Sequence, residues 1–277
     1  MALNRTIGVV QMDCVLGETK ANLDVIEAYA TLAGKLGIEL LIFPEAATTG
    51  YFLGSRLGYL AEPADGPSSK RLGTIAREAG LHLAVGAFTQ RDNCIYNSQL
   101  LFGPDGKLIE VYDKAHLFAG EREFCQAGSR PVIANTAIGK LGMTICYDLV
   151  FPDYIRSLVD GGADILINST DWINDVYQRE VWQFGGPVTL GLATTRALEN
   201  LTVLAMANRV GREKASPQLE FTSFGHSVVT GPSGKILASL TEGEGLAFSR
   251  IDYSDADVKR WTSIATYKED RRPELMK

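Results

Sequence analysis

The chain alternates between short apolar runs and longer amphipathic runs, and this pattern predicts strands interspersed with helices. Amphipathic spacing predicts helices at 18–36, 68–79, 153–160 and 188–200. Apolar and β-branched runs bounded by turn residues predict strands at 5–13, 40–43, 81–89, 97–102, 107–112, 131–135, 141–145, 164–168, 201–207, 225–230, 235–240 and 245–251. After the last predicted helix the pattern predicts only strands, followed by a polar tail from about residue 253.

Two turns share the pattern Gly-Pro-x-Gly-Lys, at 103–107 and 231–235, and each lies between two predicted strands. Such residues favour tight hairpin turns. The repetition predicts two sheets of similar construction, each with one hairpin, unless a favourable turn is simply used twice. With the helices interspersed, we expect an α/β fold in which two sheets pack face to face with helices outside. No linker interrupts the chain, so 1–277 is expected to be a single domain with a C-terminal tail.

Composition narrows the class of protein. The chain is 45% hydrophobic and 22% charged, as in ordinary globular proteins, and its net charge of −6 argues against a nucleic-acid partner. No apolar run has the length of a membrane span or a signal peptide, so we expect a cytoplasmic protein without a membrane partner. The cysteines are widely spaced and the histidines number three, which argues against a metal site and favours free thiols.

Cys146 falls where the strand predicted at 141–145 ends. Phe151-Pro152 follows, and Pro is favoured at the start of a helix such as the one predicted at 153–160. A thiol at a strand-to-helix turn is held out of the sheet, beside backbone N–H groups that can bind an oxyanion. The alternative is a buried structural cysteine, since a free thiol packs like a small hydrophobic group.

Glu45 and Lys114 also follow predicted strands, and the ends of neighbouring strands often form a site in layered α/β proteins. The three groups are chemically compatible. A carboxylate in a dry pocket has a raised pKa and can take up and return a proton. An ammonium is expected to lower the pKa of the Cys146 thiol and to neutralise charge on an attacked oxygen.

Several segments along nearly the whole chain form one ordered set: Phe43-Pro44-Glu45 with Thr49-Gly50-Tyr51, then 112–118, Gly120-Glu121-Arg122, 142–148 with Phe151-Pro152, 163–169 with Trp172, Arg196-Ala197 with Glu199-Asn200, and 208–211. In sequence and in order, these segments resemble the nitrilase, or carbon–nitrogen hydrolase, superfamily.

The resemblance implies a four-layer α-β-β-α sandwich of two mixed sheets and a triad of Glu45 as general base, Lys114 as cation and Cys146 as nucleophile. Glu121 matches the family's second glutamate, which orients the substrate, although alone it reads as a solvated residue of a polar loop. The backbone N–H of Tyr147 is the expected second oxyanion donor. The resemblance implies no metal or organic cofactor, and a homodimer or larger homo-oligomer.

Cys146-Tyr147-Asp148 resembles the amidase and carbamoylase branches, since nitrilases of the family tend to carry Cys-Trp-Glu. We therefore expect a thiol amidohydrolase that converts small carboxamides to acid and ammonia through a thioester. N-carbamoyl amidohydrolase and nitrilase activities are the alternatives. The candidate substrate contacts are Tyr147, Trp172 and Tyr51, and an aromatic stretch at 172–177 with one carboxylate suits a neutral or amine-bearing acyl group. A carbamoylase needs a group that holds a carboxylate, for which the candidates are Arg122, Arg179 and Lys214.

Two other classes of protein compete with this interpretation. A Cys-His hydrolase would pair Cys146 with His116 or His226, but His116 is expected beside the strand end of Lys114 and His226 within a strand. A non-enzymatic binding or assembly module should lack part of the triad, whereas all its members and Glu121 are present.

Overall fold

Two mixed β-sheets form the centre of the computed structural model, which describes residues 3–254, 260, 262–264, 266–267 and 269–275. In sheet order, the first contains β15 (Gly245–Tyr253), β1 (Leu3–Gln11), β2 (Leu40–Ile42), β3 (His82–Arg91), β4 (Cys94–Phe102) and β5 (Leu108–Asp113). The second contains β14 (Ile236–Ser239), β13 (Val228–Thr230), β10 (Val203–Asn208), β8 (Ile165–Thr170), β7 (Gly139–Ile145) and β6 (Val132–Thr136).

The two sheets have the same plan. In each, the central strands run parallel: β1, β2 and β3 in the first sheet, and β7, β8 and β10 in the second. An antiparallel hairpin continues each sheet on one side, β4–β5 or β13–β14. A single antiparallel strand completes the other side, β15 or β6. The prediction of two sheets of similar construction is therefore confirmed.

The repeated Gly-Pro-x-Gly-Lys turns, 103–107 and 231–235, join the two strands of these hairpins. In each turn the N–H of the first glycine donates a hydrogen bond to the lysine carbonyl over 2.9 Å. Gly106 and Gly234 have φ angles of +81° and +75°, a region in which a side chain would be strained. The same sequence thus performs the same task at equivalent places in both sheets.

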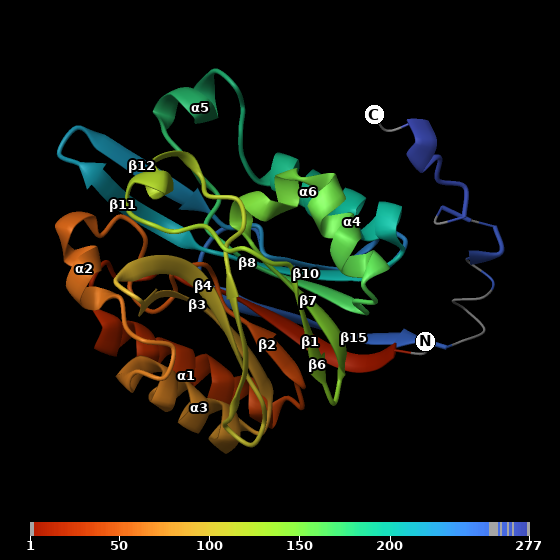
Figure 1. Ribbon diagram of the computed structural model, residues 1–277, viewed down its shortest axis with the longest axis horizontal. Helices are drawn as coiled ribbons and strands as arrows, with labels where there is room; N and C mark the ends of the chain where they lie inside the picture. Colours follow the sequence, from red (N-terminus) through yellow and green to blue (C-terminus); the bar gives the residue numbers. More distant parts are fainter. Residues whose placement is uncertain (1–2, 255–259, 261, 265, 268, 276–277) are drawn as a thin grey trace.

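Helices cover the outer face of each sheet, as predicted, and Figure 1 shows the resulting four layers. The helices α1 (Thr19–Lys35) and α3 (Pro67–Ala79) lie on the first sheet, and α4 (Pro152–Asp160) and α6 (Gly186–Asn200) on the second. Ile26 of α1 and Leu72 of α3 are buried in one cluster with strand residues of the first sheet, so the apolar stripes of the helices hold that layer in place.

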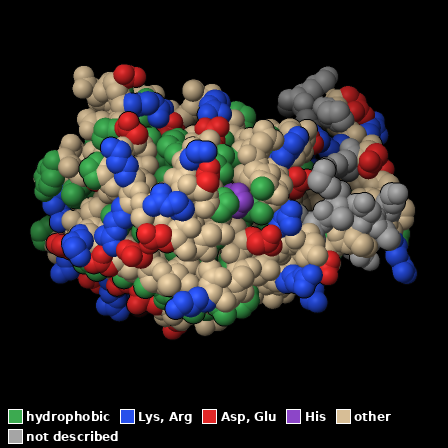
Figure 2. All heavy atoms as spheres, turned by 90° about the horizontal axis from the view of Figure 1, so that it is seen from below, with side chains coloured by type: hydrophobic (Ala, Val, Ile, Leu, Met, Phe, Trp, Pro, Cys, Tyr) green, Lys and Arg blue, Asp and Glu red, His purple; other side chains and the backbone are tan. Residues whose placement is uncertain are grey.

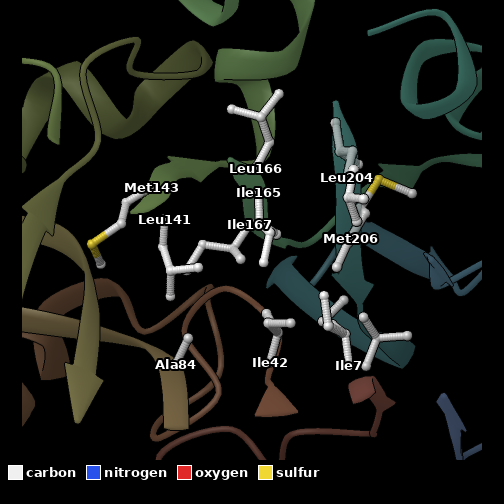
Figure 3. Close-up of a cluster of buried hydrophobic side chains, with 14 of the residues drawn as sticks. Ile7, Ile42, Ala84, Leu141, Met143, Ile165, Leu166, Ile167, Leu204 and Met206 are labelled. Carbon is white, nitrogen blue, oxygen red and sulfur yellow. The ribbon is translucent and has the colours of Figure 1, made fainter. Parts of the chain in front are cut away.

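The inner faces of the sheets pack directly on each other, and Figure 3 shows part of this interface. Ile42 and Ala84 of the first sheet face Leu141 and Ile167 of the second. These side chains are completely buried, and the apolar surface they remove from water stabilises the sandwich by roughly 25 cal/mol per Å². This packing fixes the two sheets relative to each other and brings their strand ends together.

A third, smaller sheet was not predicted from the sequence. It contains β11 (Val210–Ser216), β12 (Leu219–Phe224) and β9 (Ile173–Asn174). Its strands carry exposed charged residues such as Arg212 and Lys214, so no apolar run marks them. The shorter helices are α2 (Leu57–Leu60), α5 (Val176–Glu180), η1 (Gly54–Arg56), η2 (Ala119–Glu123), η3 (Cys146–Val150) and η4 (Pro273–Leu275).

The strand predicted at 225–230 is shorter in the structure, because β13 begins at Val228. His226 precedes it with a φ of +63°, so the expectation that His226 lies within a strand is wrong. The segment around Glu121, predicted as a loop, is the 3-10 helix η2.

The face over α1 and α3 carries acidic and basic side chains that are interspersed (Figure 2). Lys20 and Arg71 both contact Asp24 there, at 2.8 and 2.5 Å. Among the helices of the described residues, none has both the length and the apolar character that crossing a bilayer requires. Of the tail predicted from about residue 253, residues 255–259, 261, 265, 268, 276 and 277 lie outside the described residues.

Candidate active site

The structure brings together the three strand ends that the sequence singled out. Glu45 follows β2, Lys114 follows β5 and Cys146 follows β7. The strands β2 and β5 belong to the first sheet and β7 belongs to the second. Because the inner faces of the two sheets pack on each other, the carboxyl ends of these strands meet at one edge of the sandwich. The buried carboxylate of Glu121, from η2, completes the group.

The ammonium of Lys114 lies between the two carboxylates. Its Nζ is 2.7 Å from Oε1 of Glu45 and 2.8 Å from Oε2 of Glu121. The three side chains are almost completely buried. Charges so far from water are tolerated only when they are paired and hydrogen-bonded. Glu121 is therefore an internal residue of the site, in contrast to its reading as a solvated loop residue.

Asn97 is the residue of this group that sequence reasoning missed. Its Nδ2 donates hydrogen bonds to Oε1 of Glu45 over 2.7 Å and to Oε1 of Glu121 over 2.6 Å. It lies near the middle of β4, where Asn97-Ser98-Gln99 interrupts an otherwise apolar strand with polar residues that are completely buried. That interruption was the available signal. Glu45, Asn97, Lys114 and Glu121 are called the Lys114 cluster below.

Cys146 stands at a strained turn. Its φ is +44°, a left-handed conformation that costs a residue with a side chain about 1 kcal/mol or more. It is the first residue of η3, so the N–H of Tyr147 belongs to the first turn of that helix and has no partner within it. The sulfur lies 3.8 Å from the carbonyl oxygen of Asp171. A reacting oxygen near the sulfur could thus receive a backbone hydrogen bond.

Asp148 joins the cysteine turn to the segment that carries Lys114. Its Oδ2 accepts hydrogen bonds from the Ile145 N–H over 2.8 Å and from the Tyr112 hydroxyl over 2.7 Å. Its Oδ1 accepts one from the N–H of His116 over 3.1 Å. Because Asp148 is fully buried, these bonds are shielded from water and hold the two segments at a defined separation.

A second charged group, the Arg209 cluster, supports the site from the end of β10. Arg209 is fully buried and its Nη1 lies 3.0 Å from Oδ2 of Asp171 and in contact with Glu213. The N–H of Asp171 donates to Oε2 of Glu45 over 3.0 Å. Glu213 accepts from the N–H of Tyr51 over 3.0 Å. Asp171, Arg209 and Glu213 therefore connect the Glu45 carboxylate with the loop that carries Tyr51.

Electrostatics set the protonation of the site. Burial raises the pKa of the Glu45 carboxyl to about 7, opposed by the charge of Lys114 and reinforced by that of Glu121. Burial alone would lower the pKa of Lys114, but the charges of Glu45 and Glu121 outweigh it and raise that pKa well above its usual range. Lys114 therefore stays charged, while Glu45 can gain or lose a proton near neutral pH.

The expectation of a lowered pKa at Cys146 is wrong for the resting site. Burial raises the pKa of the thiol well above its usual value, the negative charge of Glu45 raises it further, and Lys114 offsets only part of the change. The thiol is therefore neutral at rest, and forming a thiolate requires a base that accepts its proton.

A cavity of about 220 Å³ opens beside Cys146 and is called the Cys146 cavity below. Tyr147 and Trp172, two of the predicted substrate contacts, line it. Tyr51, the third, does not: its ring packs against Phe52 and Phe88, and its buried phenol has a pKa raised first by burial and then by the charges of Glu121 and Glu45. Tyr51 thus lies beside the Lys114 cluster rather than on the cavity wall.

None of the cations proposed to hold a substrate carboxylate lies in this cavity. Arg122, Arg179 and Lys214 are exposed and are absent from its walls. The carboxylate of Asp175 does not line it either, because its Oδ1 accepts a hydrogen bond from the Gln178 N–H over 2.7 Å and caps α5. The segment at 175–186 reaches over the cavity through Gln178, Trp182 and Phe184.

Both histidines considered as partners of the thiol are bound to other groups. His116 Nδ1 lies 2.8 Å from Oδ1 of Asp148, and its ring stacks on Phe151 at 3.9 Å. His226 Nδ1 lies 2.8 Å from the carbonyl oxygen of Phe224. The neighbours of Cys146 are carboxylate and ammonium groups, an arrangement that differs from a Cys-His pair. Within the described residues, no group of three or more His, Cys, Asp or Glu side chains is placed to bind a metal.

A four-layer sandwich with a thiol, two carboxylates and an ammonium at one edge defines a hydrolase with the architecture of the nitrilases. Residues 6–260 match the carbon-nitrogen hydrolase family, and the chain belongs to that family. A probable nitrilase of Schizosaccharomyces pombe is 35% identical over 99% of this chain and 98% of its own. A 2-oxoglutaramate amidase of Bacillus subtilis is 31% identical over 96% and 98% of the two chains.

Among solved structures, an amidase from Nesterenkonia sp. AN1 superposes with a TM-score of 0.81 and 26% identity over 98% of this chain and 95% of that one. That structure is of a point mutant of the Nesterenkonia enzyme, and the acetamide moiety of fluoroacetamide is covalently attached to its active-site cysteine. The chain is accordingly an amidase-type enzyme that acts on carbon–nitrogen bonds.

Proposed function

We propose that the enzyme hydrolyses small primary carboxamides to carboxylic acid and ammonia, with Cys146 as nucleophile and a thioester as intermediate. The observation that carries the proposal is the link between thiol and base: Asp171 contacts the Cys146 sulfur through its carbonyl oxygen and Glu45 through its N–H. Glu45, with a pKa near 7, can accept the proton of a thiol that does not ionise unaided.

In the first half of the reaction, Glu45 takes the thiol proton as the sulfur attacks the amide carbon. The C–O double bond opens to an oxyanion, which the Lys114 ammonium and the Tyr147 N–H stabilise. The protonated Glu45 then donates to the amide nitrogen, the C–N bond breaks, and ammonia leaves. An amide nitrogen is a poor leaving group until it is protonated, which is why an acid must stand beside the thiol.

In the second half, Glu45 is again a carboxylate. It removes a proton from a water molecule while the water oxygen attacks the thioester carbon. The tetrahedral intermediate collapses, the C–S bond breaks, and the proton held by Glu45 returns to the sulfur. Glu121 accepts a hydrogen bond from Lys114 and another from the Phe118 N–H, over 2.8 and 2.6 Å. We assign it the role of orienting Lys114 and the substrate amide.

The comparisons support this proposal in two ways. In a point mutant of the Nesterenkonia amidase the active-site cysteine carries the acetamide moiety of fluoroacetamide, and Cys146 is the candidate for the same nucleophilic role here. The name of the Bacillus subtilis relative describes hydrolysis of a carboxamide, the C–N bond type proposed for this enzyme.

The test is an ammonia-release assay over matched amide, N-carbamoyl and nitrile forms of the same acyl groups. We expect turnover of the amides at least about 10-fold above the other two forms, and loss of essentially all turnover in Cys146→Ala. Mass spectrometry of the protein during turnover should show an acyl adduct on the peptide that contains Cys146. A preference for N-carbamoyl compounds or nitriles would assign the enzyme to another branch of the family.

A further inference from the structure

The Cys146 cavity has walls that are almost entirely apolar. Aromatic and aliphatic side chains from four separate segments surround it: Phe118, Val150, Trp172, Ile173, Trp182 and Phe184. Trp172 and Phe184 meet edge to face with ring centroids 6.1 Å apart, as do Phe118 and Tyr147 at 5.3 Å. Such contacts hold aromatic walls in place and favour apolar ligands.

The volume of the cavity suggests the size of its occupant. An apolar cavity of about 150 Å³ is known to accept a benzene molecule. At about 220 Å³, the Cys146 cavity has room for a phenyl ring with one or two methylene groups, or for a branched chain of comparable bulk. An acetyl group would leave most of this space unfilled and would forgo the free energy of apolar burial.

The charges around the cavity exclude acyl groups that carry a carboxylate. No Lys or Arg is present among the described residues that line it. The one charged side chain among these lining residues, Asp171, is already paired: its Oδ2 lies 3.0 Å from Nη1 of Arg209 and its Oδ1 accepts a hydrogen bond from the Ser223 hydroxyl over 2.6 Å. A carboxylate on the substrate would therefore lie in a mostly apolar cavity with no cation to pair with, which is strongly unfavourable.

We propose that the Cys146 cavity is an acyl-binding site for uncharged apolar acyl groups of arylalkyl or branched-alkyl type, and that it rejects amides bearing a second carboxylate. This inference rests on the proposed amidase function and specifies its substrates. Trp182 determines the specificity, since it lines the outer part of the cavity although 67% of its surface remains exposed.

The experiment compares two amides of similar shape, 5-methylhexanamide and glutaric acid monoamide. The first carries an isopropyl group at the position where the second carries a carboxylate. Acetamide and 3-phenylpropanamide complete the series. We expect kcat/KM for 5-methylhexanamide to exceed that for the monoamide by at least about 100-fold, because burying a carboxylate without a cation beside it weakens binding by several factors of ten. We expect 3-phenylpropanamide to exceed acetamide by at least about 10-fold.

Substitutions in the cavity wall test whether the acyl selectivity arises there. Trp182→Ala should lower the ratio of kcat/KM for 5-methylhexanamide over acetamide by roughly 10-fold, because it removes one apolar wall. Val188→Ala is the matched control, since Val188 is an exposed apolar residue close by in the chain that does not line the cavity. Val150→Lys introduces a cation at the cavity wall and should reduce the discrimination against the monoamide at least 10-fold.

Failure of this inference differs from failure of the proposed function. If wild-type enzyme hydrolyses the acid-bearing monoamide as well as its isopropyl counterpart, the apolar acyl site is refuted while amidase activity stands. An unchanged selectivity in both Trp182→Ala and Val150→Lys would equally refute it. If no amide in the series releases ammonia in a reaction that depends on Cys146, the proposed function itself is refuted.

Discussion

The side-chain amide nitrogen of Asn97 lies 2.7 Å from Oε1 of Glu45, a hydrogen bond that ties the middle of β4 to the loop after β2. The same nitrogen lies 2.6 Å from Oε1 of Glu121. Asn97 therefore holds two buried carboxylates that would otherwise repel each other, and it does so without adding charge. Its position makes it a positioning residue for the proposed general base.

Replacing Asn97 by Asp should raise the pKa of Glu45 further, because a third negative charge next to the carboxylate disfavours its ionised form. We expect the acid side of the kcat/KM profile to move to higher pH by at least about one unit, and kcat to fall at least about 10-fold. The pH profile of amide hydrolysis measures both.

Gln99→Ala is the matched control for Asn97. Gln99 is a buried amide two residues further along β4, and its Nε2 donates to the Ser169 hydroxyl over 2.7 Å. Losing this bond should reduce stability by about 1–3 kcal/mol and leave the pH profile unchanged. A shift of the profile in Gln99→Ala as large as that in the Asn97 variant would refute the positioning role.

The second prediction concerns the pH dependence of Glu45. In the free enzyme its pKa is raised by burial to about 7, and it must be ionised to accept the thiol proton. We therefore expect kcat/KM to rise with pH up to about 7 and then level off. Rate measurements between about pH 5 and pH 8 test this, and an acid limb near the ordinary carboxyl pKa of 4.5 would contradict it.

Stability provides an independent readout of the same group. Because the pKa of Glu45 is higher in the folded than in the unfolded chain, its contribution is fully present below the ordinary value of 4.5 and is lost as pH rises through about 7. Wild-type protein should thus lose stability relative to Glu45→Gln between about pH 5 and pH 8 in urea unfolding.

Replacing Lys114 should lower both the stability of the protein and its amidase activity. Lys114→Ala leaves Glu45 and Glu121 buried without their shared cation, which should cost about 3–5 kcal/mol. Lys114→Ala with Glu121→Gln should recover part of the stability and none of the activity. The activity losses of Lys114→Ala and Cys146→Ala should not add, because the proposed triad acts as one unit. Near-normal turnover in Lys114→Ala would remove it from the triad.

Arg209 should prove essential for the structure of the site. Arg209→Met leaves Asp171 and Glu213 buried without their cation and should destabilise the protein by about 3–5 kcal/mol. Arg212→Met is the control, since Arg212 meets Glu220 at 3.5 Å on the surface and should change stability by about 0.5 kcal/mol or less. Equal effects of the two substitutions, measured by urea unfolding, would argue against the role of the Arg209 cluster.

The fifth prediction is a homodimer in solution. Val176, Tyr177, Val181 and Trp182 are exposed apolar residues on and directly after α5, which projects from the sandwich in Figure 1. An exposed apolar patch of this kind is typical of a protein interface. Light scattering at micromolar concentration should give the mass of a dimer, and Tyr177→Glu should shift it towards the monomer. A wild-type monomer at that concentration would rule out this assembly.

The sequence by itself determined the layers of the fold and the three strand ends that are proposed to form the site. Hydrophobic periodicity is a local property, so the helices α1, α3, α4 and α6 and the central strands could be predicted from it. The repeated Gly-Pro-x-Gly-Lys turn correctly indicated two sheets of one plan, because a left-handed glycine and a proline specify a turn without help from distant residues. The family motifs then selected Glu45, Lys114 and Cys146.

The tertiary structure alone decided how these residues act on one another. The packing of the sheets places Asn97 between two carboxylates, and no periodicity marks a polar residue in the middle of a strand as a contact of a residue 52 positions away. The thiol pKa was wrongly expected to fall, since local reasoning counts the charge of Lys114 and omits burial, which outweighs it. The hairpin of β11 and β12 was missed because it carries charged residues, and its buried Glu213 accepts a hydrogen bond from the N–H of Tyr51, 162 positions away, a contact that only long-range packing creates.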